Sequence, residues 1–221
     1  MSSENSLHYT NVYAVVSGLH NNNWVLRDIY DRILTGELLD PRDAEELLYE
    51  YLEDGELKSL PDNIAIAFEL DAHDSAQFTV QTLWNAAHDT SLMWDHEYTD
   101  TDRIYATMFS LHDDAEIYLV VFGSIFDREF RENQRGVGAI TAGAWKFFDA
   151  SCKTPITVTV DSCTPKLVTS TIAGEIADAF NAAGLETIIN EDQTVTVYAK
   201  WRHHVLPYED AVWAASLAPR G

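Results

Sequence analysis

The densest group of side chains that could perform chemistry lies between His88 and Arg103. His88 and His96 could carry protons, and Asp100 and Asp102 form a carboxylate pair beside Arg103. Such a pair acts as acid and base only where a cleft perturbs its pKa values. The same run also fits a helix start, because Thr and Asp favour the N-cap and the first turn. We favour the helix start and keep Asp100, Asp102, Arg103, His88 and His96 as candidate catalytic residues.

The histidines and acids near this group match no compact metal-binding motif. Zinc needs three or four ligands that converge at ~2 Å, often from a motif such as His-Glu-x-x-His. The other histidines and acids in this part of the chain are His112, Asp89, Asp95, Glu97 and the run Asp71-Ala72-His73-Asp74. None has the required spacing, and we predict no metal. The glycines at 136, 138 and 143 form no phosphate-binding fingerprint, so we predict no cofactor either.

The two cysteines, Cys152 and Cys163, flank a predicted strand. Met1 to Thr10 is polar, and no apolar run approaches the ~20 residues needed to span a bilayer. We therefore expect a cytoplasmic protein with reduced thiols and no membrane contact. The sequence leaves open whether Cys152 and Cys163 pair.

The charge of the chain is strongly negative, with 14 Lys and Arg against 36 Asp and Glu and a formal net charge of −22. Such a surface repels nucleic acid and anionic membranes and favours basic partners. The charge has three explanations: a solvated acidic surface, a face for a basic protein, or carboxylates that mimic DNA phosphates. We expect a basic protein partner and no direct contact with nucleic acid.

Apolar periodicity predicts helices in the first half of the chain and mainly strands in the second. The expected helices cover 24–34, 41–54, 62–90, 99–112, 168–183 and 207–218. The expected strands cover 116–122, 144–149, 156–160, 185–189 and 194–201, and a charged amphipathic segment covers 125–135. We predict an α+β fold in which an N-terminal helical layer packs on a mainly antiparallel sheet of about five strands. We expect one compact unit, 1–221, with 9–113 mainly helical and 114–204 forming the α+β sheet portion.

Several short blocks carry a likeness to a known family. They are Tyr49-Glu50-Tyr51-Leu52-Glu53-Asp54, Trp94, Thr99-Asp100-x-Asp102-Arg103-Ile104, Ala182-Ala183-Gly184-Leu185 and Lys200-Trp201-Arg202. In this order they resemble an uncharacterised, mainly actinobacterial family defined only as a domain of unknown function. Its members often carry clustered cysteines after the strand that matches Glu116–Phe122, and here Gly123 to Arg128 contains none. The resemblance implies the order of elements and a bacterial source, and it lends no activity.

These observations favour a non-enzymatic acidic binding or regulatory protein that acts on a basic protein partner. One alternative is a small hydrolase or metal-dependent enzyme that uses Asp and His groups near residues 88–103. Another is a nucleic-acid-mimicking inhibitor, which would need carboxylates spaced like a duplex backbone. The sequence leaves the oligomeric state open.

Overall fold

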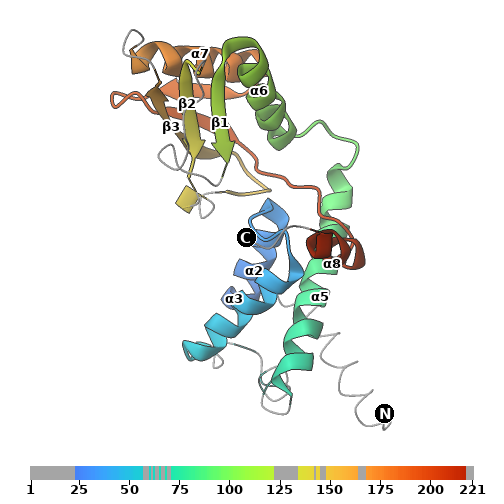
Figure 1. Ribbon diagram of the computed structural model, residues 1–221. Helices are drawn as coiled ribbons and strands as arrows, with labels where there is room; N and C mark the ends of the chain where they lie inside the picture. Colours follow the sequence, from blue (N-terminus) through green and yellow to red (C-terminus); the bar gives the residue numbers. More distant parts are fainter. Residues whose placement is uncertain are drawn as a thin grey trace. The chain divides into compact units, whose positions relative to one another are not determined.

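The computed structural model describes residues 23–56, 60, 62, 65, 68, 71–121, 134–141, 143–144, 148–163 and 168–217 (Figure 1). Its helices are α2 (Trp24–Thr35), α3 (Pro41–Glu53), α5 (Ala72–Ser91), the 3₁₀ helix η2 (Leu92–Trp94), α6 (Asp100–Ala115), α7 (Thr169–Ala182) and α8 (Tyr208–Leu217). Its strands are β1 (Ile117–Val121), β2 (Gly136–Ile140), β3 (Thr154–Ser162), β4 (Glu186–Ile189) and β5 (Val195–Ala199). The fold is α+β, with N-terminal helices preceding the strands, as predicted. Within these ranges no helix has both the length and the apolar character for crossing a bilayer.

The chain divides into two compact units. The helical unit contains Met1–Asp95 and His203–Gly221, and the sheet unit contains His96–Arg202. Helix α6 belongs to the sheet unit because it packs against β1 and α7. The expectation of one compact unit stays a prediction.

Local signals set the helix boundaries of the helical unit. The Asn23 side chain accepts a hydrogen bond from the backbone N–H of Leu26 at 3.1 Å and caps α2. Gly36 ends α2 in the left-handed conformation, with φ 74°. Asp40 caps α3, and Pro41 occupies its first turn. Of the helix expected over 62–90, α5 forms from Ala72 onward, and most of 61–70 lies outside the described residues.

The sheet has the strand order β1-β2-β3-β5-β4. The β1–β2 pair is parallel and the other three pairs are antiparallel. Helix α7 packs against the sheet and buries Ile172, Ile176 and Phe180 in its core. Trp201, just after β5, is 1% exposed and stacks on Phe148 with ring centroids 4.1 Å apart. This stacking anchors the segment that leaves the sheet.

The strand expected over 144–149 is wrong for the residues that are described there. Ala144 lies in a helical turn, Phe148 and Asp149 have no strand structure, and 145–147 lie outside the described residues. The strand lies earlier, at β2. Its residues Gly136 and Gly138 did not indicate a strand, because glycine is depleted in strands. A Cβ at Gly136 would lie only 2.5 Å from Cγ2 of Ile172, so glycine lets α7 approach the sheet closely. Residues 122–133, which hold most of the expected charged segment, also lie outside the described residues.

The two cysteines lie beyond opposite ends of β3 and are both free. A nine-residue strand is about 30 Å long. A disulfide requires Cα atoms within about 7 Å. Cys152 and Cys163 therefore do not pair with each other in this fold.

Candidate functional site

The start of α6 is fixed by a reciprocal capping box. The backbone N–H and the hydroxyl of Thr99 donate to Oδ2 of Asp102 at 2.8 and 2.7 Å. The backbone N–H of Asp102 donates back to Oγ1 of Thr99 at 3.2 Å. This exchange satisfies backbone groups that have no partner within a helix. Asp102 is therefore a capping residue.

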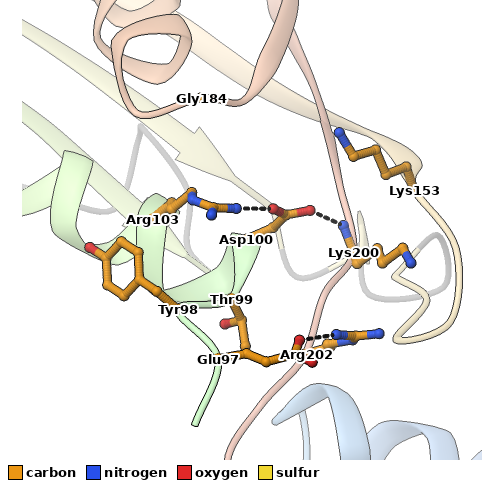
Figure 2. Close-up of a pocket in the computed structure, with 9 residues that line it drawn as sticks. All are labelled: Glu97, Tyr98, Thr99, Asp100, Arg103, Lys153, Gly184, Lys200 and Arg202. Carbon is orange, nitrogen blue, oxygen red and sulfur yellow. Dashed lines mark hydrogen bonds and ion pairs between the residues drawn. The ribbon is translucent and has the colours of Figure 1, made fainter. Parts of the chain in front are cut away.

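Asp100 joins the first turn of α6 to the segment that follows β5. One carboxylate oxygen accepts from Nη1 of Arg103 at 2.7 Å, and the other accepts from the backbone N–H of Lys200 at 3.0 Å. The neighbouring Thr101 hydroxyl accepts from the backbone N–H of Arg202 at 2.7 Å. Figure 2 shows the Asp100 carboxylate between the Arg103 guanidinium and Lys200. The helix start and the end of the strand thus hold each other in place.

Arg202 connects this segment to the loop before β3. Its Nε donates to the carbonyl of Ala150 at 2.9 Å, and its Nη1 pairs with Glu97 at 2.8 Å. The backbone N–H of Trp201 donates to the carbonyl of Asp149 at 2.9 Å. The loop before β3, the end of β5 and the start of α6 therefore meet at one place in the sheet unit.

The loop before β3 is shaped by the carboxylate of Asp149. It accepts from the backbone N–H and the hydroxyl of Ser151, both at 2.6 Å, and from the backbone N–H of Cys152 at 3.1 Å. Burial works to raise the pKa of Asp149, but the hydrogen bonds from Ser151 and Cys152 outweigh it and lower the pKa to about 2. The hydrogen bond to Asp149 raises the pKa of the Cys152 thiol, as does slight burial. Cys152 therefore stays protonated and is a poor nucleophile.

A pocket of about 330 Å³ opens where these three segments meet. It is lined by Glu97, Tyr98, Thr99, Asp100, Arg103, Lys153, Gly184, Lys200 and Arg202 (Figure 2). Four of the 14 basic residues of this acidic chain thus surround one pocket. Both carboxylates of the pocket are already paired, Asp100 with Arg103 and Glu97 with Arg202.

The two lysines of the pocket have no carboxylate partner among the residues that the structure describes. The antiparallel register pairs Thr154 of β3 with Ala199 of β5. Lys153 and Lys200 stand one residue beyond that pair, on adjacent chain segments. Like charges in facing positions of a sheet repel each other, so an anion between or beside them would stabilise the arrangement. The pocket can therefore neutralise an anion and donate hydrogen bonds to it.

The sequence-based candidates fall in different places. Asp100 and Arg103 line the pocket, and Asp102 caps α6. His88 lies on α5 in the helical unit, with its Nδ1 2.6 Å from the carbonyl oxygen of Val205. His96 is exposed in the connector before α6 and does not line the pocket. The described residues contain no group of three or more His, Cys, Asp or Glu side chains placed to hold a metal ion.

Sequence reasoning did not propose the other four charged residues of the pocket as site residues: Glu97, Lys153, Lys200 and Arg202. Glu97 and Arg202 are 105 positions apart. The β3–β5 pairing brings Lys153 beside Lys200, and hydrogen bonds between the start of α6 and the segment after β5 bring Glu97 beside Arg202. A usable signal was present, since basic residues are scarce in this chain, Lys200 lies near the end of the strand predicted over 194–201, and Lys153 lies three residues before the strand predicted over 156–160. Pairing those strands antiparallel would have placed Lys153 near Lys200.

Comparisons with protein-family models, with curated proteins and with solved structures find no match for this chain. The likeness to an actinobacterial family of unknown function therefore stays a prediction. The functional argument rests on the geometry of the pocket.

Proposed function

We propose that the sheet unit is a binding module for a small dianion of the phosphate monoester class. The observation that carries the proposal is the pair Lys153 and Lys200, which line one pocket and have no carboxylate partner among the described residues. An ammonium group is a strongly hydrated point charge with three donors, and it is a common phosphate ligand. Arg103 and Arg202 also line the pocket and add guanidinium donors to it.

The charge of the whole chain makes the location of these cations informative. With a net charge of −22, long-range repulsion disfavours anions over most of the surface. At physiological ionic strength the Debye length is ~8 Å, so distant carboxylates are largely screened while groups in contact with a ligand are not. An anion would therefore bind through its direct partners in the pocket.

The state of the two carboxylates supports binding over acid–base catalysis. Asp100 bonds to Arg103 and to the backbone of Lys200, and Glu97 pairs with Arg202. Both are held as hydrogen-bond acceptors that position cations. The alternative hydrolase would need a different proton carrier, because neither His88 nor His96 lines the pocket. A nucleic-acid-mimicking activity and a cytoplasmic location both stay predictions.

Titration calorimetry with phenyl phosphate at 0.15 M ionic strength tests the proposal. We expect saturable one-site binding to the full chain, and about tenfold weaker binding for Lys153→Gln and for Lys200→Gln. Loss of one charge-assisted hydrogen bond costs at least about 1.4 kcal/mol, which is a factor of ten. Lys200→Arg retains the charge and should retain most of the affinity.

Arg27→Gln is the matched control, because Arg27 is an exposed cation of the helical unit with 62% of its side chain accessible. It should bind phenyl phosphate like the unchanged protein. Equal losses in Arg27→Gln and Lys200→Gln would indicate a general charge effect and contradict the proposal. Absence of saturable binding to the unchanged protein would contradict it directly.

A further inference from the structure

The helical unit contains an apolar pocket that the proposed function does not use. It has a volume of about 400 Å³, and its walls include Leu38, Leu39, Trp84, Leu206, Ala211 and Ala214. Leu39 is 61% exposed and Leu206 is 51% exposed, so two leucines stand at its rim in contact with solvent. An apolar recess with exposed leucines at its rim is typical of a binding site.

Helix α8 extends this apolar area beyond the pocket. Ala211 and Ala214 of α8 face the pocket, whereas Val212, Trp213 and Leu217 are exposed. Trp213 is 66% exposed and Leu217 is 64% exposed, which is unusual for such large apolar side chains. A helix that is apolar on more than one face is normally buried. The outer face of α8 therefore lacks a covering element among the described residues.

Helix α3, which packs beside α8, carries a row of carboxylates. Nη2 of Arg42 donates to the carbonyl of Ala215 at 3.1 Å, so the start of α3 adjoins the end of α8. Spacings of three and four residues place the exposed side chains of the row on one face of α3. The row consists of Asp43, Glu46, Glu50 and Glu53. It extends over about 15 Å at a rise of 1.5 Å per residue.

The negative charge of this row is largely uncompensated within its own segment. Residues 40–56 hold eight Asp and Glu and a single basic residue, Arg42, which is bonded to Asp40. Burial raises the pKa of Asp43, and the charges of Asp40 and Glu46 raise it further. The carboxylates therefore repel one another, and cations placed along α3 would relieve that repulsion.

We propose that the apolar pocket, the outer face of α8 and the carboxylate row of α3 form one docking surface for a basic amphipathic helix of a partner protein. An apolar side chain of the partner enters the pocket, and others cover Trp213 and Leu217. Lys and Arg residues along its flank face the carboxylates of α3. This is the helix-in-groove mode of recognition, with charge setting the orientation.

Charge complementarity selects this occupant over two others. A second copy of the chain also carries a net charge of −22 and would be repelled. An anionic membrane surface would be repelled for the same reason. A cationic helix with one apolar face satisfies both the apolar and the acidic parts of the surface.

A synthetic peptide serves as the probe: a 14-residue helix with Leu at i, i+3, i+4 and i+7 spacing and Lys elsewhere. Its binding to the full chain is measured by fluorescence anisotropy at 0.15 M salt. We expect at least tenfold tighter binding than for a scrambled peptide of the same composition, and no binding for a peptide with Glu in place of Lys. Equal affinity for the ordered and scrambled peptides would overturn the proposal, because charge alone would then explain binding.

Variants locate the surface. Trp213→Ala and the double variant Glu46→Lys/Glu50→Lys should each weaken peptide binding at least tenfold. The controls lie in the sheet unit: Ile188→Ala removes a 47% exposed apolar side chain, and Glu191→Lys reverses an exposed charge. Both controls should bind the peptide unchanged. Unchanged affinity in the helical-unit variants would overturn the proposal, and so would a dimer of the unchanged protein that Trp213→Ala disrupts in sedimentation experiments.

Discussion

Glu37 provides a direct test of the electrostatics of the helical unit. One of its carboxylate oxygens accepts from Nη1 of Arg32 at 3.3 Å, and the other is buried without a hydrogen-bond partner in the described part of the chain. Arg32 is shared, since its Nε pairs with Asp28 at 2.8 Å. Burial raises the pKa of Glu37 to about 7, with Arg32 acting to lower it and Asp28 to raise it. We predict that Glu37→Gln stabilises the protein at alkaline pH.

The magnitude follows from proton linkage. The unfolded chain has Glu37 at its ordinary pKa of 4.5, so between pH 4.5 and about 7 the folded state binds more protons than the unfolded state. The free energy of unfolding then falls as pH rises through this window. At 1.36 kcal/mol per pKa unit, the full penalty above pH 7 is about 3 kcal/mol. The side chain is 20% exposed, so solvent screening reduces this penalty. We expect the difference in free energy of unfolding between Glu37→Gln and the unchanged protein to increase by about 2 kcal/mol from pH 5 to pH 8.

Urea unfolding followed by far-ultraviolet circular dichroism at pH 5 and pH 8 measures this gap. Glu50→Gln is the matched control, because it removes one negative charge from an exposed position of α3. It should change stability by a similar small amount at both pH values. The argument from burial would be refuted if Glu37→Gln changed the free energy of unfolding equally at pH 5 and pH 8. It would also be refuted if Glu50→Gln showed the same dependence on pH as Glu37→Gln.

Two further substitutions test the packing and the helix start of the sheet unit. Gly136→Ala should lower the free energy of unfolding measured in urea by about 1–3 kcal/mol, because the new Cβ collides with the buried side chain of Ile172. Unchanged stability would mean that α7 is not held close to β2. Thr99→Ala should cost about 1 kcal/mol and lower the thermal midpoint, because it removes the hydroxyl that bonds to Asp102. A midpoint equal to that of the unchanged protein would contradict the capping role.

The sequence predicted best those features that depend on a few neighbouring residues. Gly36 after α2, the Asp40–Pro41 start of α3 and the Thr99 start of α6 all occur where their residue types placed them. Caps depend on backbone groups within one helical turn, so a short window of sequence contains the cause. The division into helices followed by a mainly antiparallel sheet followed from periodicity for the same reason.

Features that depend on distant partners were harder to predict. Strand β2 was missed because its glycines are explained by distant neighbours: a Cβ at Gly136 would meet Ile172 of α7, and a Cβ at Gly138 would meet Leu119 of β1. The pocket was missed because Lys153 and Lys200 become neighbours through the register of β3 and β5. A single sequence does not reveal the contacts of these glycines or the register of β3 and β5. The candidate residues Asp100 and Arg103 were found because their roles begin at a helix cap.

The distribution of charge argues against treating the acidity of this chain as a uniform solvated coat. A uniform coat would scatter the 14 basic residues, each beside an acidic partner. Instead, four of them line one pocket of the sheet unit, and its two carboxylates are already engaged with guanidinium groups. The segment 40–56 of the helical unit shows the opposite bias, with eight acidic residues and one basic residue. Each bias opposes folding through self-repulsion, and an oppositely charged ligand on each unit would offset it. The two proposals therefore have the same physical basis. A group of like charges lowers the stability of each unit, and binding of an oppositely charged ligand would relieve that repulsion.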